Sequence, residues 1–422
     1  MKIRLSLILT QGFSVLFGLA VGSPAFGFDL SLIKNVTQRA YSQAEQAITI
    51  NRANPYNIFI ATNGRGYYDQ TYLVFARSIN GGYTWRRGTF ANGSDGLPAA
   101  CCEPSLTSDR FGNLYIAYLK TFSREVIVGR STDGGRHWTQ LANLGSGEQP
   151  TIVAGPGTAP REQSIWVTWT HYRDDGIGQL LAAGATATGR GQLGSFLTKI
   201  VPYTLDPPYK VGGFGDIAIG PGGKVVVAHQ DINSGEGPDA IRVNTYYPSN
   251  CSGEFGSTIT ATLMDPNNVV IGAWHHIPAQ PIRSVYAAAR LAWSLKTNRL
   301  FMVYTDADSA DSNDTNIELI YSDDDGATWS LPLRLNDDNT NRSQFLPRIA
   351  LDSTTGNLAI VWYDARNDDG SGADRQRDFI PNGEAELWGT VSFDGGQSFV
   401  RNFKISAGMS SAPLAATVAP PD

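Results

Sequence analysis

The chain has 422 residues, of which 41% are hydrophobic and 17% charged, and its formal net charge is −6 at neutral pH. This composition is typical of a globular protein with a sizeable core, and the acidic balance without a basic stripe excludes a nucleic-acid partner. The 45 glycines, 22 prolines and 9 tryptophans indicate many tight turns between short strands.

Residues 1–27 are predicted to be a secretory signal peptide. Lys2 and Arg4 form a basic start, an apolar run follows, and the segment GSPAFG supplies small residues for cleavage after Ala25 or Gly27. Removal of this segment leaves a net charge of −8. The run is short and interrupted, and no later segment is apolar enough to span a bilayer. We therefore expect export to an extracellular, periplasmic or cell-surface location, with no transmembrane segment in the mature chain.

A short octet then recurs along the chain with the pattern Ser-x-Asp/Asn-x-Gly-x-x-Trp/Phe. It reads SINGGYTW at 78–85, STDGGRHW at 131–138, SDDDGATW at 322–329 and SFDGGQSF at 392–399. Two degenerate versions end at Phe196 and Phe255. Each copy follows a short β-like run, so the octets divide the chain into six similar units.

Each unit also contains a strand, a glycine or asparagine turn and a second strand, as in EPSLTSDRFGNLYIAYLK. Four antiparallel strands repeated six times predict an all-β fold, a six-bladed β-propeller over residues 44–405. Residues 28–43 form an N-terminal extension in this interpretation, and residues 406–422 a disordered tail.

The octet itself is best explained as a structural turn. An Asp or Asn oxygen can accept the amides of its own turn, a glycine can adopt positive φ, and the closing aromatic ring can cover the sheet. His137 occurs in one copy only, so we expect no shared role for it. The structural octet residues are Asn80, Trp85, Asp133, Trp138, Asp324, Trp329, Asp394 and Phe399.

The octet resembles the Asp-box, or BNR repeat, of the sialidase superfamily of propellers, and the resemblance covers roughly residues 44–405. The octets join the third and fourth strands of each blade, so loops that bind a ligand are expected at the opposite end. The resemblance implies the same, because the active site of these propellers lies away from the Asp-boxes. We expect a glycan or glycoconjugate as ligand, with no cofactor required.

Polar residues gather in the loops predicted for that end. Asp216, Arg290 and Arg348 fall at one register near the start of the first strand of their units. Such charges in a crowded channel either meet a ligand or form an Arg–Asp network that closes the channel. The other binding candidates are Arg65, Tyr68, His171, Arg173, Asp364 and Arg366.

The resemblance to sialidases implies three catalytic parts. An arginine cluster grips the substrate carboxylate, a tyrosine nucleophile is activated by a glutamate, and an aspartate is the acid/base. The residues that fit are Arg290, Arg348 and Arg366 for the cluster, Tyr363 or Tyr304 for the nucleophile, Glu103 for its activation, and Asp231 or Asp69 for the acid/base.

The chain departs from the sialidase pattern ahead of the first octet. The Arg-Ile-Pro-type motif expected there is missing, and Arg348 lies in the last unit instead. The sequence therefore favours a non-catalytic, glycan-binding propeller. The alternatives are an exo-α-sialidase or related glycoside hydrolase, and a protein-interaction scaffold.

Two smaller features are open to two interpretations. The acidic loop with Asp306, Asp308, Asp311 and Asp314 is dense enough in oxygen for calcium, or is simply a solvated loop.

The three cysteines allow either a Cys102–Cys251 bridge or a bond between Cys101 and Cys102. A bond between the neighbours would give a ligand a rigid apolar platform at the entrance to the second unit, and a buried thiol is the alternative.

Overall fold

The structure is a computed structural model, and the part of the chain that it describes consists almost entirely of strands. One short 3-10 turn, η2 (Pro221–Gly223), interrupts them, and no helix in the described part is long and apolar enough to span a bilayer. The described residues are 34–38, 43–65, 71–172, 178–202, 210–232, 239–248, 253–262, 270–272, 274–307, 309, 312–371 and 380–411.

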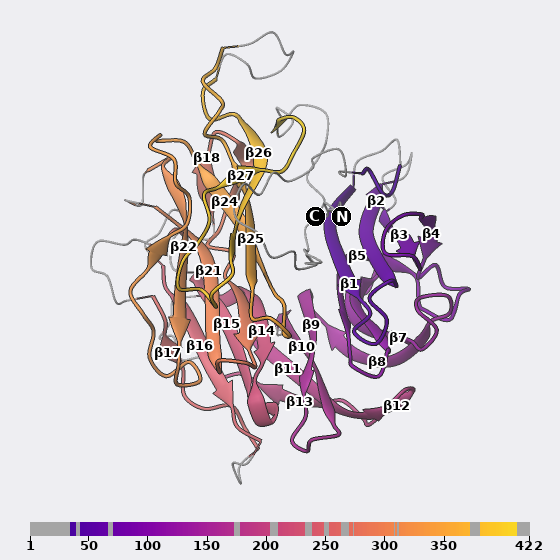
Figure 1. Ribbon diagram of the computed structural model, residues 1–422. Coiled ribbons are helices and arrows are strands. Elements are labelled where there is room, and N and C mark those ends of the chain that lie inside the picture. The colour runs from indigo at the N-terminus through magenta and orange to yellow at the C-terminus, as the bar shows by residue number, and fades with distance from the viewer. Residues whose placement is uncertain are drawn as a thin grey trace, which may run out of the picture. The chain divides into compact units, whose positions relative to one another are not determined.

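The chain is a six-bladed β-propeller built of antiparallel sheets, as the repeats predict (Figure 1). It divides into two compact units, and the division falls within the fourth sheet. Unit 1 consists of Met1–Thr204, Gly213–Val227 and Asn244–Thr258, and unit 2 of Leu205–Gly212, Ala228–Val243 and Ile259–Asp422.

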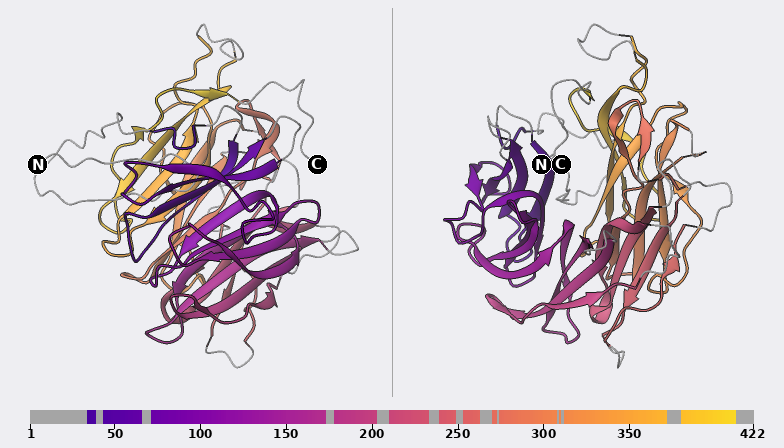
Figure 2. Two further views of the ribbon diagram at one scale, coloured as in Figure 1. Left: turned by 90° about the vertical axis from the view of Figure 1, so that its right-hand side faces the viewer. Right: turned by 180° about the vertical axis from the view of Figure 1, so that it is seen from behind.

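Blades 1 to 3, all in unit 1, follow one plan, with strands that pair in chain order; Figure 2 shows them in indigo to magenta. Blade 1 contains β1 (Gln43–Ile50), β2 (Ile58–Arg65), β3 (Thr71–Ser78) and β4 (Arg86–Phe90). Blade 2 contains β5 (Ala100–Ser108), β6 (Leu114–Lys120), β7 (Glu125–Ser131) and β8 (Thr139–Ser146). Blade 3 contains β9 (Glu148–Pro156), β10 (Gln163–Tyr172), β11 (Gly178–Gly189), β12 (Gln192–Leu193) and β13 (Leu197–Ile200).

Blades 4 to 6 repeat the plan, with an additional hairpin before blade 5 that the repeats do not predict. Blade 4 contains β14 (Lys210–Ile219), β15 (Val225–Ile232), β16 (Ile241–Tyr246) and β17 (Ile259–Thr260), and the hairpin is β18 (His275–Ile277) and β19 (Gln280–Val285). Blade 5 contains β20 (Arg290–Ser294), β21 (Arg299–Ala307), β22 (Thr315–Ser322) and β23 (Leu333–Arg334). Blade 6 contains β24 (Gln344–Leu351), β25 (Leu358–Asp364), β26 (Glu384–Ser392), β27 (Phe403–Lys404) and β28 (Ser410–Ser411).

The hydrophobic core lies between neighbouring blades, so the middle strands are buried on both faces. Strand β6 shows why its sequence LYIAYLK is apolar throughout. Its alternate residues point to opposite faces, with Ile116 and Tyr118 in the cluster shared with blade 1 and Tyr115 and Ala117 in the cluster shared with blade 3.

The four octets form the turns predicted for them. In every copy the first serine accepts the amide of the second glycine position at 2.8 Å, and the Asp or Asn accepts a further turn amide. Gly135 has φ +86°, and a Cβ there would lie 2.4 Å from the Phe59 ring of blade 1. This position therefore requires glycine for both its backbone conformation and its contact with the neighbouring blade.

His137 does have a role shared with its counterparts, contrary to the expectation from sequence. Its Nδ1 lies 2.6 Å from the second carboxylate oxygen of Asp133. The hydroxyl groups of Thr328 and Ser398 donate to the equivalent oxygen in their own octets. The three side chains differ in type but bind the same atom, so pattern matching by residue type could not detect the equivalence.

The register shows which end of each blade faces away from its octet. In blade 2, Ala100 at the start of β5 pairs with Lys120 at the end of β6. The octet begins at Ser131, which pairs with Leu114 at the opposite end of the blade. We call the end where the first strand starts the far end of a blade. Glu103, one of the candidates from the sequence, lies near the far end of blade 2.

The chain outside the predicted blade boundaries also makes contacts. Val36, within the predicted N-terminal extension, is buried in a cluster with Ile58 and Ile60. Beyond residue 405, Ser410 and Ser411 pair with β26 as β28. The described structure thus continues past the predicted end of the propeller.

Candidate functional site

The first strands of four blades carry the same β-bulge near their far ends. Each bulge contains one non-glycine residue with positive φ, and these residues are Glu45 (54°), Glu103 (56°), Gln149 (53°) and Leu346 (54°). A register shift accompanies each of them. Bulges re-aim side chains and are common beside functional sites. The bulges therefore determine which side chains reach the far end.

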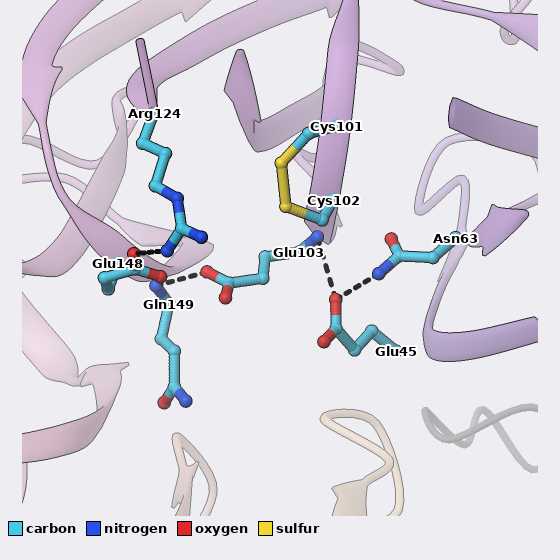
Figure 3. The surroundings of a disulfide bond; sticks show 8 residues. All are labelled: Glu45, Asn63, Cys101, Cys102, Glu103, Arg124, Glu148 and Gln149. Carbon is cyan, nitrogen blue, oxygen red and sulfur yellow. Dashed lines mark hydrogen bonds and ion pairs between the residues drawn. A yellow bond between two sulfur atoms is a disulfide. The ribbon is translucent and has the colours of Figure 1, made fainter. Parts of the chain in front are cut away.

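In unit 1 the bulges bring three glutamates together, and we call Glu45, Glu103 and Glu148 the acidic site (Figure 3). The amide of Glu103 donates to Glu45 Oε2 at 3.0 Å, and the amide of Gln149 donates to Glu103 Oε2. Glu45 and Glu103 thus each bind the bulge of the next blade. The outer two carboxylates have further partners, because Asn63 donates to Glu45 and Arg124 pairs with Glu148.

Glu103 is the unusual member of the acidic site. Burial, together with the negative charges of Glu45 and Glu148, raises its pKa to about 8. A hydrogen bond between the carboxyl groups of Glu103 and Glu148 acts in the same direction. Glu103 is therefore mostly protonated at neutral pH and can donate a hydrogen bond beside carboxylates that accept.

Two apolar features border the acidic site. Cys101 and Cys102 form a disulfide immediately before Glu103, which decides between the two pairings that the sequence left open. Tyr172, at the end of β10, is 57% exposed. Burial and the carboxylates of Glu148 and Glu103 raise the pKa of Tyr172, which places its hydroxyl near them. His171 beside it bonds through Nδ1 to the carbonyl of Ser146 at 3.0 Å.

In unit 2, the predicted ligand-binding residue Arg366 is already engaged by other side chains. Its guanidinium donates to Asp364 at 3.0 Å, to Asp337 at 2.7 Å and to Asn402 at 2.9 Å, and it lies 4.3 Å from the centre of the Trp388 ring. Arg366 and Asp364 thus belong to a structural network of ion pairs and hydrogen bonds.

A pocket of about 510 Å³ opens beside this network. Its lining residues are Asp337, Asp338, Asn339, Arg366, Trp388, Arg401, Asn402, Phe403 and Lys404. The pocket lies within unit 2, and its lining includes Arg366 of the predicted arginine cluster but neither tyrosine nor Glu103 or Asp231.

The other predicted residues of unit 2 lie on three different blades. Asp231 is buried and pairs with Arg242 at 2.8 Å, while the Tyr363 ring stacks on Phe345 at 5.6 Å. Tyr363 and Glu103 belong to different units, so their proposed partnership stays a prediction.

Arg290 and Arg348 lie at the same register of β20 and β24, two strands that contact each other. Arg290 donates to the carbonyl of Ala289 at 3.2 Å, and Nη1 of Arg348 is buried without a hydrogen-bond partner among the described residues. Asp216 is buried in β14 of unit 1.

Several predictions fall on residues outside the described part of the chain. They concern Tyr68, Asp69, Arg173, Cys251, Asp308, Asp311 and the side chain of Arg65. The calcium site therefore stays a prediction, although no three His, Cys, Asp or Glu side chains among the described residues are placed so that they could hold a metal ion together.

Glu45 and Glu148 were missed as site residues in the sequence. The signal that could have found them is the lead-in to the first strands, where EQA, EPS and QPT align at residues 45–47, 103–105 and 149–151. Aligning these segments places Glu45, Glu103 and Gln149 at one position. Glu148 immediately precedes Gln149 in the chain, so the same alignment also points to Glu148.

A comparison with known protein families agrees with the repeat. The BNR/Asp-box repeat model matches residues 320–331, which contain the third octet. No curated protein sequence matches the chain.

Solved structures that resemble the chain include several glycosidases. A Hadza microbial sialidase is 14% identical with a TM-score of 0.44, and the match covers 76% of this chain but only 63% of that one. An α-L-arabinofuranosidase from Fusarium graminearum is 11% identical with a TM-score of 0.47, covering 78% and 90%. The Trypanosoma rangeli sialidase is 11% identical with a TM-score of 0.43, covering 78% and 53%. The repeat match and the six-bladed fold confirm the predicted resemblance to Asp-box propellers of the sialidase superfamily.

Proposed function

We propose that the chain recognises a carbohydrate at the far ends of blades 1 to 3, in the acidic site. The observation that carries this proposal is the position of Glu103 between Glu45 and Glu148, where burial and the two neighbouring charges raise its pKa to about 8. A sugar hydroxyl donates and accepts hydrogen bonds at once, so it is matched by a site that offers both. The acidic site offers a donor and acceptors close together.

The borders of the acidic site fit the same ligand. The ring of Tyr172 is exposed and offers apolar surface. The Cys101–Cys102 disulfide offers more, directly before Glu103 in the chain (Figure 3). Ligand sites commonly combine an apolar lining with a few fixed polar groups. This combination suits the apolar face and hydroxyl edge of a sugar ring.

Binding of the whole protein to an array of neutral, amino and acidic glycans tests the proposal. We expect Glu103→Gln and Tyr172→Ala to weaken the signal on the same glycans. Glu125→Gln is the matched control, because Glu125 is the same residue type on the same blade but pairs with Lys120 outside the acidic site. Absence of glycan binding, or equal binding by all four proteins, would contradict the proposal.

Glycoside hydrolysis is the second candidate, and the raised pKa of Glu103 favours it. A carboxylic acid that stays protonated at neutral pH can protonate a leaving oxygen, while an ionised neighbour such as Glu148 assists. Turnover of aryl glycosides that is lost in Glu103→Gln but kept in Tyr363→Phe would support this mechanism. The opposite pattern on an aryl sialoside would support the tyrosine mechanism of sialidases.

The proposal includes export of the protein by residues 1–27. The support is the order of basic, apolar and small residues in that segment. Sequencing the amino terminus of the protein from its native cells tests it, with a start at residue 26 or 28 expected. An unprocessed start at Met1 would contradict it.

A further inference from the structure

The Cys101–Cys102 disulfide occupies a special place in the chain. It lies in β5, where Cys102 pairs with Leu119 and a register shift occurs on each side of this pair, so the ladder is irregular around the disulfide. Glu103 follows directly with positive φ, and Pro104 follows Glu103. A bond between adjacent cysteines closes a small ring around their peptide bond, and proline fixes its own φ. The backbone of Glu103 is therefore restricted on both sides.

Comparison with the other blades shows that the bulge itself needs no disulfide. Gln149 and Leu346 adopt the same positive φ, and each is followed by a proline. Glu45 adopts it without either neighbour. Forming the bulge therefore does not explain the disulfide in blade 2.

Blade 2 differs from these blades in the side chain that its bulge must hold. Glu103 is placed against Glu45 on one side and Glu148 on the other, and burial and both charges disfavour its ionised form there. A free glutamate would turn away from two carboxylates and towards water. The cysteine pair opposes this movement, because it also packs against the core between blades 2 and 3.

We propose that the Cys101–Cys102 disulfide is a positioning element that holds Glu103 between Glu45 and Glu148. The charged and titratable groups around Glu103 are those two glutamates, Arg124, which pairs with Glu148, and Tyr172. Opening the disulfide releases Glu103 from this cluster. Its effect on ligand affinity rests on the proposed carbohydrate recognition, whereas its effect on Glu103 does not.

Reduction with tris(2-carboxyethyl)phosphine tests the inference. The phosphine gives two electrons to the sulfur–sulfur bond, the two sulfurs take up two protons from water, and the phosphine retains the oxygen as its oxide. The titration of Glu103 is followed by NMR of protein labelled at the glutamate carboxyl carbons, with Glu103→Gln assigning the signal. We expect a midpoint near 8 in the oxidised protein and a fall of about one unit or more after reduction.

Controls separate positioning from a general effect on folding. Cys251→Ser leaves the disulfide intact and should titrate like the oxidised protein. If reduction unfolds the protein, as circular dichroism would show, Cys101→Ala combined with Cys102→Ala removes the bond without burying thiols and gives the same measurement. An unchanged midpoint in a folded protein that lacks the bond would overturn the inference.

Glycan affinity provides an independent second measurement. Reduction should raise the Kd by about tenfold, as expected when a functional group is displaced, and should have no further effect in Glu103→Gln. Equal weakening in both backgrounds would overturn the positioning role. A shifted midpoint in a protein that binds no glycan would support the positioning role of the disulfide and contradict the proposed function. Glycan binding with an unchanged midpoint would support the proposed function and overturn the positioning role.

Discussion

Glu103 in unit 1 and Arg366 in unit 2 are both ionisable groups withdrawn from water at the far end of a blade, but their surroundings treat charge in opposite ways. Arg366 has acceptors on Asp364, Asp337 and Asn402, so its charge is compensated. Glu103 has two carboxylates as neighbours and holds its proton instead. Arg366, whose charge is compensated, stabilises the fold, whereas Glu103, which has no compensating cation among the described residues, is available for chemistry.

The largest effect is expected from removing Arg366. Arg366→Ala leaves the buried carboxylate of Asp364 without its cation, and breaking such a pair from one side costs about 3–5 kcal/mol of unfolding free energy. Urea denaturation measures it. Arg401→Ala, which removes an exposed arginine from the same pocket, is the control and should change little. A loss as small as that of the control would show that the Arg366 network is not structural.

The next effect is a pH dependence caused by Glu103. Its pKa is about 8 in the folded protein and ordinarily 4.5, so the folded state binds one more proton between these values. The contribution of Glu103 to the free energy of unfolding is therefore fully present below pH 4.5. It falls as the pH rises towards 8, by at most about 1.4 kcal/mol for each pH unit. Denaturation of wild type and Glu103→Gln at several pH values checks this. The variant should lack this fall, and parallel curves would refute the assignment to Glu103.

The smallest effect is expected where water already screens the charges. His137 and Asp133 form an exposed pair in the octet of blade 2. His137→Thr restores the hydroxyl found at Thr328 and should keep the melting temperature, whereas His137→Ala should lower it slightly, since exposed pairs contribute below about 1 kcal/mol. A large loss in His137→Thr would show that the imidazole has a role beyond the shared hydrogen bond.

The fold could be predicted because its main signals are local. An octet such as 131–138 contains its own hydrogen-bond partners. The amide of Gly135 donates to the hydroxyl of Ser131, and the amide of His137 donates to the carboxylate of Asp133. Counting the four octets and their two degenerate versions gives six blades without knowledge of distant contacts. The hairpin β18–β19 has no counterpart in the other blades, so the repeat could not predict it.

The site was harder to predict because it depends on pairing between distant segments. Arg366 was expected to grip a ligand, but Asp337 and Asn402, remote in sequence, occupy its donors. Glu103 was a candidate for activating a tyrosine nucleophile, which stays a prediction, whereas Glu45 and Glu148 drew attention only once the bulges brought them together. Residue type indicates which side chains can react, and the pairing register decides which of them meet.

The repeated bulge has a consequence for how such a protein can change. Glu45, Glu103, Gln149 and Leu346 share one backbone conformation although their side chains differ in charge, polarity and size. A point substitution at this position therefore exchanges the group displayed at the far end while the strand that carries it is retained. For evolution or protein engineering, each bulge is thus a position at which the displayed side chain can be exchanged one blade at a time.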